Sequence, residues 1–241
     1  MRVKLLQANA FGGVADFWFG PRAERSKTRD SLGLAPETVA LVTVANLTRR
    51  KGHLVTLAAL SRLSPLLCKR LSWLVVGSND EPDYVDELKA AISSSGCDVR
   101  LMGALESQQI RDVYGASDLF CLTPEEELFE PAQEYSLVYL EAAACGLPSI
   151  ATAYGDATDA VIDNQTGRVV APSVRAIADA IAELMMDGIK RVSLGKRAWM
   201  RAREMNRDRC IATTCLPLPS GAHVEQGPEN VRGHSAIEVT K

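Results

Sequence analysis

The sequence predicts an α/β protein built as a Rossmann-like open parallel sheet with helices on both faces. Short apolar runs of strand length alternate along the chain with longer segments whose apolar residues recur at helical spacing. This βαβα alternation is typical of a mostly parallel sheet covered by helices. The composition agrees, because 46% hydrophobic and 24% charged residues are ordinary for a chain that buries a core.

The alternation begins at residues 39–45 (VALVTVA), where β-branched residues indicate a buried strand. A helix then opens at 51–53, and Leu57, Ala58 and Leu60 are among the residues expected on its buried face. The remaining strands are expected at 72–76, 99–102, 119–122, 149–152 and 167–170. The remaining helices are expected at 82–95, 107–116, 137–145, about 174–186 and about 189–206.

The two ends of the chain differ from this middle part. Residues 1–36 show no strand–helix repeat and are expected to be a lead-in segment, whereas 37–208 are expected to form the Rossmann-like domain. From 209 to 241 the periodicity vanishes, and proline and glycine punctuate the chain. That composition predicts a disordered or loosely attached tail.

The net charge, the lengths of the apolar runs and the spacing of cysteine and histidine disfavour several functional classes. A net charge of −3 offers no basic footprint for nucleic acid. No apolar run reaches membrane-spanning length, and the first residues lead into no signal-peptide segment. A soluble cytoplasmic protein is therefore expected, and peripheral membrane association stays compatible with it. The six cysteines form no CxxC pair, and the three histidines have no zinc-ligand spacing, so we expect no metal and no cofactor. A GxGxxG fingerprint and a Walker A loop are also missing.

A basic loop follows the first predicted strand. Residues 46–53 (NLTRRKGH) contain Arg49, Arg50 and Lys51. In an open α/β sheet, ligands bind beyond the carboxyl ends of the strands, so these side chains are placed to neutralise a diphosphate beside the positive end of the next helix. The alternative is a solvated basic loop at a helix start, and this motif taken alone favours that alternative.

A second segment, 133–148 (QEYSLVYLEAAACGLP), combines a helix start with a carboxylate. The helix is expected to begin near Ser136, where unpaired backbone N–H groups can hold a phosphate. Glu141 lies deeper in this helix on an otherwise small and apolar face, where a carboxylate is costly unless it has a partner such as a ribose hydroxyl. The alternative is an ordinary αβ unit with an exposed glutamate.

Together these segments resemble the C-terminal domain of the retaining glycosyltransferases of family four. This GT-B group includes relatives of sucrose and glycogen synthase and bacterial mannosyltransferases. The resemblance runs from about Asn9 to about Asp208 and implies the fold of a single GT-B half-domain. It is carried, in order, by residues 44–53, 114–120, 135–148, 164–167 and 194–198.

The resemblance also implies roles by position, with a nucleoside-diphosphate sugar as the donor. Lys51, Arg50 and Glu134 would form the catalytic set. Lys51 would contact the diphosphate, Glu141 the ribose, and the backbone amides of 136–138 the distal phosphate, while the edge at 101–103 would line the base pocket. The implied donor-binding residues are Asn46, Lys51, Met102, Gln133, Glu134, Ser136, Leu137, Val138 and Glu141.

The sequence departs from the family pattern within both motifs. Asn46 stands where the family has its diphosphate arginine, so that charge would come from a neighbouring arginine of the loop. The family's spacing puts its first glutamate at Gln133, whereas the glutamate here comes one position later, at Glu134. Either Glu134 substitutes through a one-residue slip, or Gln133 contacts the sugar without charge. Residues 134–136 also replace Gly-Phe-Gly, which adds side chains where the backbone approaches phosphate.

The predicted function is that of the donor-binding domain of a glycosyltransferase, which moves a hexosyl group from a nucleoside-diphosphate sugar to an acceptor with retention. The family's acceptor-binding domain has no counterpart in this sequence, so three alternatives stay open. They are a non-catalytic nucleotide-sugar-binding module, an enzyme completed by a separate chain that carries the acceptor domain, and a truncated inactive fragment. The acidic residues 125–127 and Glu130 are interpreted as a solvated loop rather than a metal site.

Overall fold

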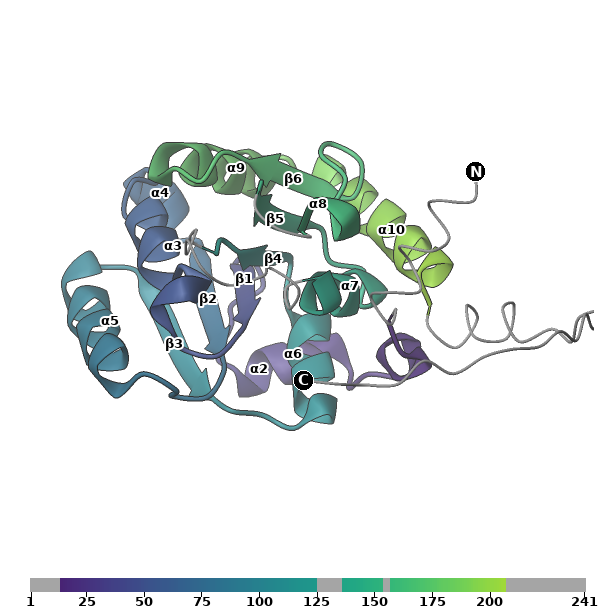
Figure 1. Cartoon of the computed structure of the whole chain (residues 1–241), viewed down its shortest axis with the longest axis horizontal. Helices are drawn as coiled ribbons and strands as arrows, with labels where there is room; N and C mark the ends of the chain where they lie inside the picture. Colours follow the sequence, from purple (N-terminus) through teal and green to yellow (C-terminus); the bar gives the residue numbers. More distant parts are fainter. Residues whose placement is uncertain (1–13, 125–135, 154–156, 207–241) are drawn as a thin grey trace, which may run out of the picture.

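The computed structural model describes residues 14–124, 136–153 and 157–206. At their centre is a six-stranded sheet in the order β3-β2-β1-β4-β5-β6, in which every neighbouring pair is parallel. The strands are β1 (Val39–Val44), β2 (Leu71–Val76), β3 (Asp98–Gly103), β4 (Leu119–Leu122), β5 (Ser149–Thr152) and β6 (Gly167–Val170). Helices cover both faces of the sheet (Figure 1), so the predicted open parallel α/β fold is confirmed.

The sheet separates two hydrophobic cores. Successive residues of β1 alternate between them, because Ala40 and Val42 join one core and Val39 and Leu41 join the other. Since both faces are covered, the inner strands β1, β2, β4 and β5 are buried on both sides, and this explains their largely apolar sequences. The helices that contribute mainly to the first core are α6 (Ser107–Ala116), α7 (Ser136–Ala144) and α10 (Gly188–Glu204). Those that contribute mainly to the second are α3 (His53–Leu60), α5 (Pro82–Ser95) and α9 (Val174–Met186).

Most predicted elements have the expected bounds, but the predicted buried face of α3 is wrong at one residue. Ala58 was expected on the buried face and is exposed, whereas Ala59 is buried. The helix begins at His53, and at 3.6 residues per turn its buried side is centred on His53, Leu57 and Leu60, which puts Ala58 on the opposite side. The periodicity also left out the shortest elements: η1 (Asp16–Phe19), α2 (Arg25–Ser31), η2 (Arg49–Lys51), α4 (Pro65–Cys68) and α8 (Ala157–Ala160).

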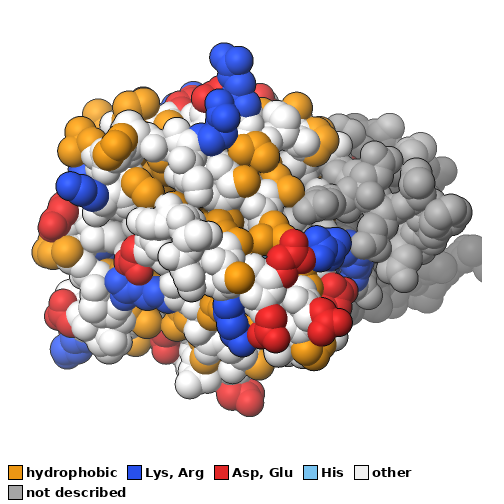
Figure 2. Space-filling view, turned by 90° about the vertical axis from the view of Figure 1, so that its left-hand side faces the viewer, with side chains coloured by type: hydrophobic (Ala, Val, Ile, Leu, Met, Phe, Trp, Pro, Cys, Tyr) orange, Lys and Arg blue, Asp and Glu red, His pale blue; other side chains and the backbone are white. Residues whose placement is uncertain are grey.

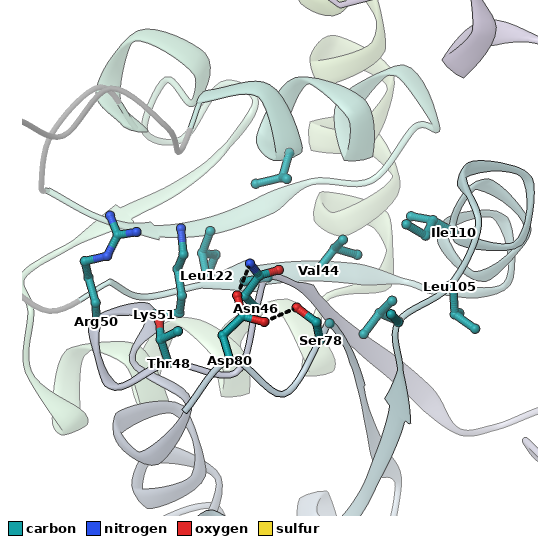
Figure 3. Close-up of a pocket in the computed structure, with 15 residues that line it drawn as sticks. Val44, Asn46, Thr48, Arg50, Lys51, Ser78, Asp80, Leu105, Ile110 and Leu122 are labelled. Carbon is teal, nitrogen blue, oxygen red and sulfur yellow. Dashed lines mark hydrogen bonds between the residues drawn. The ribbon is translucent and has the colours of Figure 1, made fainter. Parts of the chain in front are cut away.

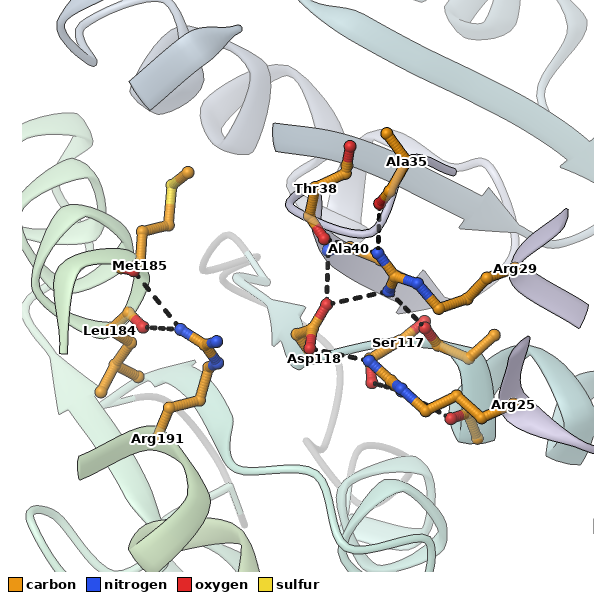
Figure 4. A network of polar contacts seen from close by, with 12 residues as sticks. Arg25, Arg29, Ala35, Thr38, Ala40, Ser117, Asp118, Leu184, Met185 and Arg191 are labelled. Atoms are coloured by element: carbon orange, nitrogen blue, oxygen red, sulfur yellow. Dashed lines mark hydrogen bonds and ion pairs between the residues drawn. The ribbon is translucent and has the colours of Figure 1, made fainter. Parts of the chain in front are cut away.

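The segment that precedes β1 is tied to the sheet by a buried arginine. Arg29 of α2 reaches the carboxylate of Asp118 at 3.2 Å. Arg25 donates to the same carboxylate at 2.8 Å, and the backbone N–H of Ala40 does so at 2.9 Å (Figure 4). The other donors of Arg29 bond the carbonyl oxygens of Ala35, Thr38 and Ala116. Residues 14–36 therefore pack on the sheet, while the domain boundaries given above stay predictions.

The two ends of the described part meet. Val14 and Asn206 form a parallel bridge, and the backbone N–H of Val14 donates to the carbonyl of Met205 at 3.1 Å. The side chain of Asn206 also donates to Asp16 at 2.7 Å. The tail predicted for 209–241 lies outside the described residues. Among the described helices, none combines the length and the apolar composition needed to cross a membrane.

Charges of both signs are mixed on the face shown in Figure 2, which is the side of the molecule where α5 lies. As far as this face is described, it therefore carries no continuous basic stripe of the kind that nucleic-acid phosphates require.

We predict that Arg29→Ala lowers the free energy of unfolding by about 2–3 kcal/mol, because it leaves buried carbonyl oxygens and one side of the Asp118 carboxylate without donors. Urea denaturation measures the change. Lys27→Ala, on the same helix with an exposed side chain, is the matched control and should change stability by less than about 0.5 kcal/mol. Equal effects of the two substitutions would contradict the anchoring role of Arg29.

Candidate functional site

A pocket of about 350 Å³ opens at the carboxyl ends of the central strands. β1, β2 and β4 contribute their last residues, Val44, Val76 and Leu122. The chain connections diverge between β1 and β4, where the strand order reverses, and doubly wound sheets bind their ligands at this point. The other lining residues are Ala45, Asn46, Thr48, Arg50, Lys51, Gly77, Ser78, Asp80, Ala104, Leu105, Ile110 and Val138.

Gly52 fixes the position of the basic loop. Its φ of 71° lies in the left-handed region, and a Cβ at this position would lie 1.8 Å from the carbonyl oxygen of Thr123. The hydroxyl of Thr123 in turn donates to the carbonyl of Gly52 at 3.3 Å. This close approach holds η2 against the end of β4. As a result, Arg50 and Lys51 extend side by side at one end of the pocket (Figure 3).

An acidic side chain lies near this basic pair. The carboxylate of Asp80, in the loop after β2, accepts a hydrogen bond from Nδ2 of Asn46 at 2.6 Å and another from the hydroxyl of Ser78 (Figure 3). The pocket therefore combines two cationic side chains with a hydrogen-bonded carboxylate. Such a site can hold an anionic group against the cations and accept hydrogen bonds from hydroxyl or N–H groups of the same ligand.

The first turn of α7 forms part of the pocket wall. The hydroxyl of buried Tyr139 donates to the carbonyl of Leu122 at 2.7 Å and holds the helix against β4. Val138 lines the pocket, whereas Leu137 is exposed. Backbone N–H groups in the first turn of a helix lack intrahelical partners, so this end of α7 can receive an anion.

Glu141 is a partly buried carboxylate with no hydrogen-bond partner among the described residues. Burial raises its pKa from 4.5 to about 7. Glu141 does not line the pocket, but it lies one helical turn after Val138 on the same side of α7. A carboxylate that is desolvated without a partner costs free energy, and a ligand hydroxyl would reduce this cost.

The structure brings only some of the sequence-predicted residues together. In the pocket wall are Asn46, Arg50, Lys51 and Val138. Met102 packs against the core instead, and Ala104 and Leu105 form the wall that was expected from the 101–103 edge. Ser136 is the first residue of α7. Outside the described residues lie Gln133, Glu134, the acidic residues 125–127 and Glu130. The ligand contacts assigned to all these residues stay predictions.

Sequence reasoning missed Ser78, Asp80 and Leu105. The loop after β2 ends at the same edge of the sheet as the basic loop, so applying the strand-end rule to every strand would have found Asp80. Nothing in the local sequence indicates that Leu105 lines a pocket.

The buried histidine next to the basic loop does not line the pocket. His53 is 1% exposed, and its ring lies 6.4 Å from that of Trp73 and 6.2 Å from that of Tyr84, measured between centroids. Burial lowers its pKa to about 4, so the imidazole is neutral at pH 7. It packs within the core on the α3 side of the sheet.

Comparison with known proteins identifies the family. A family model described as glycosyl transferases group 1 matches residues 24–200. The chain belongs to this glycosyltransferase family. It is 34% identical over 194 residues to the D-inositol 3-phosphate glycosyltransferase of Actinosynnema mirum, covering 77% of this chain and 45% of that protein. It is 30% identical over 221 residues to a GDP-mannose-dependent alpha-(1-6)-phosphatidylinositol monomannoside mannosyltransferase of Mycobacterium tuberculosis, covering 81% and 54%.

Solved glycosyltransferase structures show the same fold. The crystal structure of Anabaena Alr3699/HepE in complex with UDP-glucose matches with a TM-score of 0.71 at 25% identity, covering 84% of this chain and 55% of that chain. The chain thus spans about half the length of the glycosyltransferases it resembles. The predicted family and the predicted Rossmann-like half-domain are both confirmed.

We predict that Glu141→Gln stabilises this glycosyltransferase domain at high pH only. The folded-state pKa is raised above 4.5 to about 7, so the folded chain binds more protons between these values and loses stability as pH rises through them. Removing the charge should leave stability unchanged near about pH 4 and increase it by up to about 3 kcal/mol near about pH 8.

Thermal or urea unfolding across this pH range measures the effect. Glu204→Gln, at an exposed position in α10, is the control and should show no such pH dependence. A constant effect of Glu141→Gln at all pH values would argue against a desolvated carboxylate.

Proposed function

We propose that this chain is the donor-binding half of a retaining glycosyltransferase and holds a nucleoside-diphosphate hexose in the pocket at the carboxyl edge of the sheet. The observation that carries the proposal is the position of Lys51 and Arg50, which line a pocket at the switch point of the strand order. These two positive side chains lie at the point of the sheet where doubly wound proteins bind their ligands. Membership of the group 1 family supplies the chemical class of the ligand.

Each part of the donor has a proposed partner. Lys51 and Arg50 neutralise the diphosphate, and the first-turn amides at 136–138 take its distal phosphate. Glu141 accepts a hydrogen bond from the ribose, which would reduce the cost of its desolvation. The apolar wall of Leu105 and Ile110 contacts the base. Gln133 and Glu134 are the proposed contacts of the sugar hydroxyls.

The proposed chemistry breaks the bond between the anomeric carbon and the diphosphate oxygen. Negative charge grows on the departing diphosphate, and Lys51, Arg50 and the amino end of α7 stabilise it where it develops. The acceptor hydroxyl adds on the face that the diphosphate leaves and gives its proton to the departing diphosphate oxygen, so that the anomeric configuration is retained. No protein nucleophile, metal or cofactor is part of the proposal, because the positive charge comes from these side chains and the helix end.

Transfer also requires an acceptor held against the anomeric carbon in a cleft from which water is excluded. The acceptor and the complete transfer reaction are therefore proposed for a protein that includes a second unit, in the same chain or on a partner. The relatives suggest two candidate bases, because the Anabaena structure holds UDP-glucose and the Mycobacterium tuberculosis relative is GDP-mannose-dependent.

Calorimetric titration of the purified chain with UDP, GDP and ADP tests the donor site. We expect saturable binding of one nucleotide, weakened about 10- to 100-fold by Lys51→Ala, because one charge-assisted contact is lost. Glu141→Ala should also weaken it, whereas Lys89→Ala, an exposed lysine of α5, should not. A folded chain that binds none of the three would contradict the proposed function and leave the fold and the family intact.

Asn46→Arg provides a second test, in which the affinity for the nucleotide is expected to increase. Asn46 lies in the pocket wall with Asp80 2.6 Å away, so an arginine at this position would be held by that carboxylate while its remaining donors face the diphosphate. We expect about tenfold tighter binding of the nucleoside diphosphate. Asn46→Gln, which adds length without charge, is the matched control. If both variants bind alike, the diphosphate does not lie beside residue 46.

A further inference from the structure

Two cysteines that are distant in sequence lie in contact at the opposite edge of the sheet. The Sγ atoms of Cys68 and Cys97 are 3.5 Å apart, and both residues are half-buried. Cys68 is the last residue of α4, just before β2, and Cys97 lies between α5 and β3. The other two cysteines of the described residues, Cys121 and Cys145, are buried.

Hydrogen bonds fix the backbone on both sides of this contact. The N–H of Cys68 donates to the carbonyl of Ser64 at 2.9 Å, and the N–H of Cys97 donates to the hydroxyl of Ser95 at 3.1 Å. One residue beyond Cys97, Asp98 pairs with Ser72 in the parallel ladder of β2 and β3. The two sulfur atoms are therefore brought together by the sheet itself. To form a disulfide bond, the two sulfur atoms must approach from 3.5 Å to about 2.05 Å.

We propose that Cys68 and Cys97 are a reversible dithiol that closes to an intramolecular disulfide on reaction with a low-molecular-weight disulfide such as glutathione disulfide. One thiolate attacks the glutathione disulfide, forms a mixed disulfide and releases one glutathione thiolate. The second cysteine, already in contact, then attacks the protein sulfur of that mixed disulfide and releases the second glutathione. Two protein thiols are thus oxidised, and one disulfide is reduced to two thiols. This inference does not rest on the proposed donor site.

The bridge would close the segment 68–97, which contains β2, α5 and the loop with Ser78 and Asp80. β3, which follows this segment, is an edge strand of the sheet (Figure 1). A cross-link between the segments that lead into β2 and β3 reduces the conformational freedom of the unfolded chain, so the oxidised form should be the more stable one. Burial raises the pKa of Cys68 to about 11, which favours the thiol form and makes slow exchange the expected behaviour at neutral pH.

Glutathione disulfide treatment of the folded full chain tests the proposal. Cys210→Ser/Cys215→Ser is the background, because it removes the two cysteines outside the described residues. After long incubation at mildly alkaline pH, we expect the tryptic peptides 63–69 and 90–100 to be linked and the intact mass to fall by two hydrogens. The melting temperature should rise by several degrees and return on reduction.

Cys68→Ser in the same background separates the bridge from other thiol chemistry. This variant should show no linked peptides and no rise in melting temperature, and should instead carry glutathione on Cys97. The proposal is overturned if the background protein carries separate glutathione adducts on both cysteines, if both thiols stay free, or if the link forms only in denaturant.

Discussion

The pocket depends on the contact between Gly52 and Thr123, where the loop after β1 meets the end of β4 with no side chain between them. β1 and β4 are parallel neighbours, and their outgoing connections diverge just beyond this contact. Any Cβ at residue 52 would push η2 away from β4 and move Lys51 with it. Gly77 acts in the same way on the other side of β1, since a Cβ there would lie 1.9 Å from the carbonyl oxygen of Ala45. Gly52 and Gly77 thus fix the positions of the two loops, after β1 and after β2, that carry the polar residues of the pocket.

One charge beside the pocket is not satisfied by the protein itself, because Glu141 is desolvated without a partner among the described residues. Proteins accept such local costs where a ligand relieves them. By contrast, Asp118 at the opposite edge of the sheet is satisfied by two arginines and a backbone N–H, and it has a structural role. The difference between these carboxylates is the physical reason to place the ligand at the carboxyl edge.

The sequence was sufficient for the parts of the structure that are controlled by periodicity. Strands buried on both faces and helices of ten residues or more leave clear patterns, and α5, α6 and α9 have the predicted bounds. Ala58 was misplaced because α3 is short and apolar on several sides, so the pattern does not define its buried face. Asp80 was missed because its role depends on Asn46, a residue 34 positions away that only the parallel sheet brings within hydrogen-bonding distance. The contact between Cys68 and Cys97 escaped notice for the same reason.

The proposed donor binding and the proposed glycosyl transfer place different physical demands on the structure. Among the described residues, β1, β2 and the loops that follow them supply most of the pocket wall. The walls proposed to hold the diphosphate are therefore formed by described residues of this chain. Transfer differs, because it depends on excluding water and positioning an acceptor, and both require a surface that closes over the pocket. Nucleotide affinity therefore tests the proposed donor site, whereas turnover also tests the closed cleft.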